Sequence, residues 1–263
     1  MMLVNSVVLI LREVLEAAML ISVLLALSLN MRCRLAWFWW SLPVAIVGAV
    51  SYAVGLELVT DSLDGAGQEV ANAALQILVY CFAVGIVWLC AHGDVTGSRA
   101  VKLTLLMAAA VACAMIREGS EILIYITGFA AVEELRTAVY AGSAIGAGIG
   151  LSLGVLLFSA LRALEASMSK ITALVLLGLI GAGMVMQSTM LLQQVDWLPM
   201  GASVWDSEAL ISEQSIGGEL LYAVFGYESS PSFIQVLLYG VSLFLMVVTY
   251  TFSRRGEVAA GEI

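Results

Sequence analysis

Two copies of the pattern Arg-Glu-x-x-Glu carry the most unusual chemistry in this chain. One copy occupies residues 12–16 and the other residues 117–121. Each copy lies near the middle of a long apolar run, where a charged group costs about 2.5–3.5 kcal/mol to insert into a bilayer. The two glutamates of a copy are three positions apart, so a helix would place both carboxylates on one face. Charged groups at this depth predict a functional site.

The charges of the two copies do not balance. The ionisable residues are Arg12, Glu13 and Glu16 in the first copy and Arg117, Glu118 and Glu121 in the second. Four negative and two positive groups leave a formal charge of −2, whereas a purely structural clamp needs only one glutamate per arginine. We therefore expect the glutamates to bind protons or a cation, and the arginines to orient them and offset their charge. An ion pair is also predicted within each copy, because the arginine and the second glutamate are four positions apart.

An anionic site made only of oxygen ligands favours a hard cation. Fe(III) is the hardest common candidate, and ligand type alone leaves Mn(II), Ca(II) and Mg(II) open. The four cysteines form no CxxC pair, which argues against a disulfide framework or a soft-metal site. The single histidine, His92, lies outside the apolar runs, where we expect an ordinary surface residue. With no Ser/His/Asp set, we expect neither enzymatic activity nor an organic cofactor.

The elements that must position these groups are membrane helices. Of the 263 residues, 62% are hydrophobic and 12% are charged, with a mean hydropathy of +1.02. Soluble domains carry about 25% charged residues, so this composition predicts an integral, all-α, polytopic membrane protein. Long unbroken apolar runs argue against a porin-type barrel. The net charge of −9 argues against nucleic acid as a partner.

Seven apolar stretches are close to the length of about 20 residues that a transmembrane helix needs. They cover approximately residues 3–29, 35–58, 70–91, 103–130, 138–161, 171–192 and 232–252. Eight basic residues would then lie on one side of the membrane, namely Arg32, Arg34, Arg99, Lys102, Arg162, Lys170, Arg254 and Arg255. Only Arg136 lies on the other side. Because basic residues mark cytoplasmic loops, we expect the N-terminus outside and the tail 253–263 in the cytoplasm.

The motif copies also indicate an internal repeat within a single transmembrane domain, residues 1–263. They are 105 residues apart with three spans per unit, so repeat A (about 3–91) and repeat B (about 103–192) would have opposite orientations. An external loop, 193–231, and the seventh span follow. Transporters with such inverted repeats bind substrate near the midplane, at the repeat interface, where we expect the four glutamates to converge.

Paired R-E-x-x-E motifs in the first and fourth of seven spans resemble the oxidase-dependent iron permeases, which include fungal high-affinity iron permeases and bacterial EfeU-type proteins. A second set of segments is similar to the last external loop of that family: Val204–Ser207, Gly218–Leu221, Phe225–Tyr227 and Pro231-Ser232. The resemblance covers essentially the whole chain. The first motif has Val14 where the family usually has glycine, and the second keeps Gly119.

The resemblance implies an iron permease that carries iron, as Fe(III), into the cytoplasm. It implies a role in iron movement for Glu13, Glu16, Glu118 and Glu121, with an extracytoplasmic oxidase or iron-delivery protein as a partner. The expected location is a bacterial-type inner membrane. Two other functions stay open: a proton-coupled transporter of another divalent cation such as Mn(II), and a membrane scaffold in which the motifs are static Arg–Glu clamps.

Polar residues outside the motifs suggest a route to the site. Gln68, Asn72, Gln76 and Tyr80 recur every four residues from the outer side into the third span. They could line an access path or join helices by hydrogen bonds. The loop 193–231 contains six acidic residues and no Lys or Arg, and within it Asp206 and Glu208 could capture iron. Apolar residues around 208–226 predict one or two short helices at the membrane interface.

Four glycines along the fifth span form a close-packing face. They are Gly142, Gly146, Gly150 and Gly154. Glycine every fourth residue lets the backbones of two membrane helices approach closely. The sequence therefore predicts tight contact between this span and another helix.

Overall fold

The computed structural model describes residues 2–91, 95–213 and 215–260. His92 lies outside the described residues. The helices in the described part are α1 (Met2–Asn30), α2 (Ala36–Ser62), α3 (Gly67–Ala91), α4 (Ser98–Ala130), α5 (Glu133–Ala163), α6 (Ala166–Gln194), α7 (Ile216–Phe225) and α8 (Phe233–Ala260). An isolated β-bridge joins Ser203 and Ser232 in the segments that flank α7.

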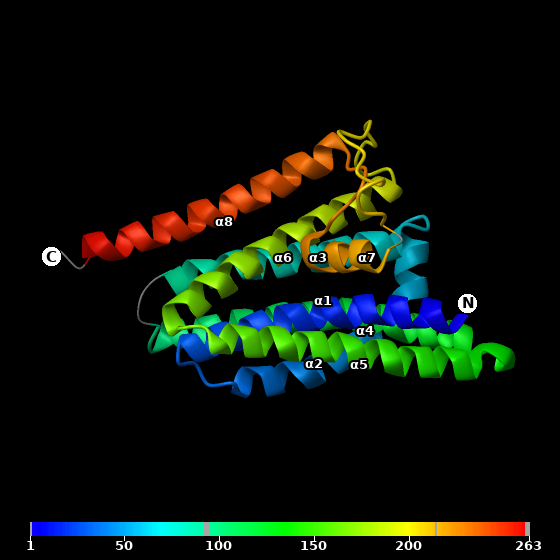
Figure 1. Ribbon diagram of the computed structural model, residues 1–263, viewed down its shortest axis with the longest axis horizontal. Coiled ribbons are helices and arrows are strands. Elements are labelled where there is room, and N and C mark those ends of the chain that lie inside the picture. The colour runs from blue at the N-terminus through cyan, green and yellow to red at the C-terminus, as the bar shows by residue number, and fades with distance from the viewer. Residues whose placement is uncertain (1, 92–94, 214, 261–263) are drawn as a thin grey trace.

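The long helices coincide with the predicted spans and form a bundle (Figure 1). Six of them, α2 to α6 and α8, are long and apolar enough to cross a membrane. The chain is thus an integral, multi-pass membrane protein. The remaining long helix, α1, has 29 residues and contains the charged residues of the first motif. Its crossing of the membrane stays a prediction.

Each motif-bearing helix packs along a helix that is not next to it in the sequence. Helix α1 packs along α5, and α4 packs along α2, while α3 and α6 pack against each other. Helix α1 also contacts α6 and α4, and α4 also contacts α3. Large apolar side chains on α2 and α8, such as Trp40, Val54 and Phe244, stay exposed. Such surfaces suit lipid, so the core lies between α1, α3, α4 and α6.

The glycine face of α5 packs on α1, as the sequence predicted for this face. A Cβ atom on Gly146 would lie 2.5 Å from the carbonyl oxygen of Val7. One on Gly154 would lie 2.7 Å from the Cβ of Ala18. Only glycine permits this separation of the two backbones, and the contacts set the position of α1 on both sides of its motif.

Helix α7 enters the bundle. It packs on α1 and α6 (Figure 1), and its C-terminal end touches Gly183, close to the middle of α6, where a Cβ would lie 2.8 Å from the carbonyl carbon of Phe225. The Ser215 hydroxyl caps the first turn by accepting from the Gly218 amide at 3.0 Å. The left-handed Gly226, with φ +66°, ends the helix. The sequence predicted one or two short helices around residues 208–226. Helix α7 is a short helix in that segment, and its placement at the membrane interface stays a prediction.

Candidate metal site

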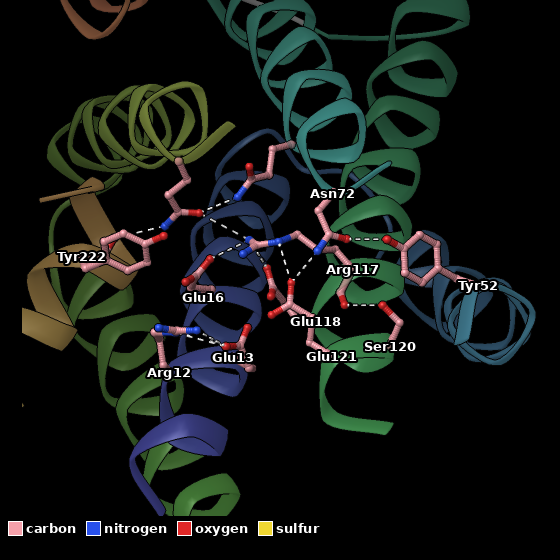
Figure 2. Close-up of polar contacts among 12 residues, drawn as sticks. Arg12, Glu13, Glu16, Tyr52, Asn72, Arg117, Glu118, Ser120, Glu121 and Tyr222 are labelled. Atoms are coloured by element: carbon pink, nitrogen blue, oxygen red, sulfur yellow. Dashed lines mark hydrogen bonds and ion pairs between the residues drawn. The ribbon is translucent and has the colours of Figure 1, made fainter. Parts of the chain in front are cut away.

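The motifs of α1 and α4 meet in the centre of the bundle (Figure 2). Glu13 is fully buried, and Glu16 and Glu118 are 3% and 2% exposed. Glu121 is more accessible, with 21% of its side chain exposed. Four carboxylates from two helices therefore share one largely dry interior.

Three of the four carboxylates are close enough to share a metal ion. One oxygen each from Glu13, Glu118 and Glu121 lie within 4.8 Å of one another. Glu13 Oε2 and Glu118 Oε2 are buried without a hydrogen-bond partner, and a buried charged oxygen without a partner is costly. A hard cation would satisfy these oxygens. The sequence predicted that all four glutamates converge. The fourth, Glu16, contacts Arg117.

Arg117 joins the two motifs. Its Nη1 donates to Glu16 Oε2 at 2.9 Å and to Glu118 Oε1 at 2.8 Å, and its Nε lies 3.5 Å from Glu121 Oε1. The Arg117–Glu121 pair was predicted from the spacing of four residues. The bond to Glu16 connects residues 101 positions apart and could not be read from spacing.

Arg12 contacts its immediate neighbour and helix α7. Its Nη2 donates to Glu13 Oε1 at 2.9 Å, and its guanidinium lies over the ring of Tyr222, 5.5 Å from the centroid. The predicted pairing of Arg12 with Glu16 stays a prediction. Tyr222 was missed by sequence reasoning, because an aromatic residue in an external loop carries no signal that its segment enters the bundle.

The polar residues that recur every four positions along α3 do not all contact the site. Asn72 Nδ2 donates to Glu121 Oε1 at 2.8 Å, and the Tyr52 hydroxyl of α2 donates to Asn72 Oδ1 at 2.8 Å (Figure 2). The Tyr52 hydroxyl also lies 3.3 Å from the Gln68 carbonyl. Asn72 thus orients the most accessible carboxylate. Tyr80 instead donates to the Ser242 carbonyl of α8 at 2.8 Å, which joins two helices away from the motifs.

Two glutamines meet beside Arg117. Gln76 Nε2 of α3 donates to Gln187 Oε1 of α6 at 2.6 Å. Arg117 Nη1 lies 3.4 Å from the same oxygen, and Gln187 Nε2 donates to the Tyr222 carbonyl at 3.2 Å. The sequence left open whether Gln76 lines an access path or joins helices by hydrogen bonds. The structure makes both residues neighbours of the charged cluster.

The predicted capture residues lie on the exposed loop and make local contacts. The Glu208 amide donates to Asp206 Oδ1 at 2.9 Å. A hydrogen bond from Ser212 lowers the pKa of Glu208, so this carboxyl stays ionised at neutral pH. Ser207 bonds Tyr227 at 2.8 Å and the Ser229 carbonyl at 3.0 Å, which ties this loop to the segment that follows α7.

The arrangement suits reversible binding of a hard cation. It offers three converging carboxylates, excludes most water and holds two tethered guanidinium groups, and the partly exposed Glu121 provides contact with the exterior of the bundle. Searches among curated proteins and among solved structures each found no match. The model of the Iron permease FTR1 family matches residues 3–255, nearly the whole chain including both motifs, and the chain therefore belongs to that family.

Proposed function

We propose that this protein carries iron, as Fe(III), into the cytoplasm through a site formed by Glu13, Glu118 and Glu121. The observation that carries the proposal is their convergence within 4.8 Å from α1 and α4, in a chain of an iron permease family. Glu16 holds Arg117 in place across the two motifs. Four carboxylates and two guanidinium groups leave room for added positive charge.

The packing of the helices supports an inverted repeat of α1–α3 and α4–α6. The contact of α1 with α5 has its counterpart in that of α4 with α2, and the contact of α1 with α6 has its counterpart in that of α4 with α3. Exchanging the two units maps these contacts onto one another, whereas the contact of α4 with α5 has no counterpart between α1 and α2 among the described residues. In the proposed topology α1 is a seventh span, the N-terminus is outside and the basic loops face the cytoplasm.

Differences in exposure support a direction of approach. Glu121 is 21% exposed, while Glu118 beside it is almost completely buried. A cation would therefore meet Glu121 first and then reach Glu118 and Glu13. Asp206 and Glu208 would concentrate the cation outside, and an oxidase or iron-delivery protein would supply it. The proposed location is a bacterial-type inner membrane.

The test is uptake of ferric citrate by the purified protein in liposomes. Glu118→Gln should abolish uptake while the protein stays folded, because it removes a charged ligand and keeps the side-chain shape. Glu165→Gln is the matched control, since Glu165 is an exposed acid outside the site. Uptake at the normal rate by folded Glu118→Gln protein would contradict the proposal.

Two further measurements separate the alternatives. Excess Mn(II) that blocks iron uptake, and is itself transported faster, would favour a divalent-cation transporter. Glu13→Asp keeps the charge but withdraws the carboxylate by one methylene. A static clamp would tolerate this change, whereas a metal site that needs three oxygens within 4.8 Å would lose most uptake.

A further inference from the structure

Arg117 and a metal ion compete for the same carboxylate. Glu118 contributes an oxygen to the three-carboxylate group and also accepts from Arg117 Nη1 at 2.8 Å. A cation bound between these glutamates would therefore lie next to a guanidinium of the same sign. Because arginine stays protonated in proteins, it cannot avoid this repulsion by losing a proton. Movement of the guanidinium away from Glu118 would relieve this repulsion.

Any new position must offer Arg117 other acceptors, since the residue is only 6% exposed and a buried charge without partners is very unfavourable. Gln187 Oε1 already lies 3.4 Å from its Nη1. Gln76 Oε1 is buried without a hydrogen-bond partner, and Gln76, Arg117 and Glu118 line the same narrow space between α3, α4 and α6. Gln76 and Gln187, called here the amide pair, thus supply acceptor oxygens next to the guanidinium.

The amide of Gln187 is held from both sides. Its Nε2 donates to the Tyr222 carbonyl of α7, and its Oε1 accepts from Gln76 Nε2 at 2.6 Å. With the nitrogen engaged on α7, the oxygen is the atom that faces Arg117. A carbonyl oxygen has two lone pairs, so this oxygen can accept from Arg117 and Gln76 together.

We propose that the amide pair receives the Arg117 guanidinium when iron takes its place on the glutamates, which makes Gln76 and Gln187 positioning residues for iron binding. The proposal rests on the proposed function of the glutamates as the iron site. In this arrangement Arg117 is a tethered cation that exchanges with the substrate. In this exchange the guanidinium keeps its contact with Glu16 throughout and returns to Glu118 when iron leaves, so the carboxylates are not left unpaired at either stage.

The proposal makes the effect of Gln187 depend on Arg117. In purified full-length protein, Gln187→Asn should weaken equilibrium binding of iron, supplied as radioactive ferric citrate, by about ten- to a hundredfold, the range expected for a hydrogen bond to a charged group. In an Arg117→Met background the same change should alter binding less than about twofold, because no guanidinium needs the amide. Such a double-mutant cycle isolates the coupling of the two residues.

Gln193→Asn is the matched control. Gln193 is another buried amide of α6, and it donates to the Pro199 carbonyl and to Ser232, each at 3.0 Å. Gln193→Asn shortens this side chain and removes comparable buried hydrogen bonds that do not involve Arg117. It should leave iron affinity unchanged. Arg117→Gln replaces Arg117→Met if the latter does not fold. Gln76→Asn gives a second test of the amide pair, with the same expected dependence on Arg117.

Each outcome decides the matter. Failure of the wild-type protein to bind iron would overturn the proposed function itself. Normal wild-type binding with unchanged affinity in Gln187→Asn would overturn the inference alone. An equal loss of affinity with and without Arg117 would also overturn it, since Gln187 would then act directly on iron or on the fold. A loss that requires Arg117 supports the exchange.

Discussion

The close contact of α5 with α1 should matter for transport because it positions the first motif. Gly146→Ala tests this. The added Cβ would lie 2.5 Å from the Val7 carbonyl oxygen and 2.9 Å from the Leu11 amide nitrogen. These atoms belong to the backbone of α1, so they cannot move aside as a flexible side chain would. The helix itself has to shift.

The size of the shift follows from the contact distance. Real Cβ atoms keep at least 3.0 Å from such neighbours, so α1 must move by at least about 0.5 Å, the difference between 3.0 and 2.5 Å. Glu13 lies within two turns of the contact, while Glu118 and Glu121 are on α4 and do not follow. Misplacement of reacting groups by about 1 Å can cost a hundredfold in rate. We therefore expect a loss in uptake of about tenfold.

The stability of the protein should fall at the same time. Overpacking of a tight interface typically costs about 1–3 kcal/mol. Replacing glycine by alanine inside a helix returns about 0.5–1 kcal/mol, so the net loss of stability should be about 0.5–2 kcal/mol. Initial rates of ferric citrate uptake in liposomes and melting temperatures in detergent measure the two effects.

Gly148 provides the control on the same helix. Nothing lies within 4 Å of a Cβ added there, so Gly148→Ala should transport at the wild-type rate and be slightly more stable. Wild-type uptake by Gly146→Ala would show that the approach of α5 does not position the motif of α1. Equal loss of uptake in both variants would show that helix composition matters and the contact does not.

Three further predictions concern the charged groups. Neutralising Asp206 and Glu208 together should raise the iron concentration for half-maximal uptake and leave the maximal rate unchanged. Charges on an exposed loop affect the capture of the ion more than they affect binding at the buried site. A lower maximal rate with unchanged half-saturation would contradict a capture role. Arg117→Lys should preserve folding better than uptake, since it keeps the charge but cannot contact Glu16, Glu118 and Glu121 with one planar group. Melting temperature measures folding, and the rate of iron uptake measures transport. An equal loss of stability and of uptake would refute this prediction. Burial, with a smaller effect of Glu213, raises the pKa of Glu228 above its usual 4.5, so the folded protein holds this proton more tightly than the unfolded chain, and stability should fall as pH rises through that raised pKa. Glu228→Gln should remove this part of the pH dependence of the melting temperature, and an unchanged profile would disprove the assignment.

Much of the fold could be predicted from the sequence because its causes are local. Each span is recognisable from the length of its apolar run, because each polar group placed in lipid adds its own energetic cost. Each of the seven predicted spans coincides with a long helix, and the spans 35–58 and 232–252 begin one residue before α2 and α8. The glycine face of α5 was likewise visible, because a repeat of four residues lies on one side of a helix. The same local rule places both glutamates of each motif on one helix face, and the structure brings oxygens of Glu13, Glu118 and Glu121 within 4.8 Å of one another.

Only the tertiary structure decided which partners these faces meet. Helical spacing shows which residues of the same helix lie beside Glu16 and beside Arg117. It does not show that these two residues, 101 positions apart, contact each other. Tyr80 shares the spacing of Asn72, yet it contacts α8 while Asn72 contacts Glu121. The insertion of α7, which brings Tyr222 to Arg12, depends on close packing against Gly183. Periodicity determines the direction of a side chain relative to its own helix, whereas the position of the neighbouring helix depends on the packing of the whole bundle.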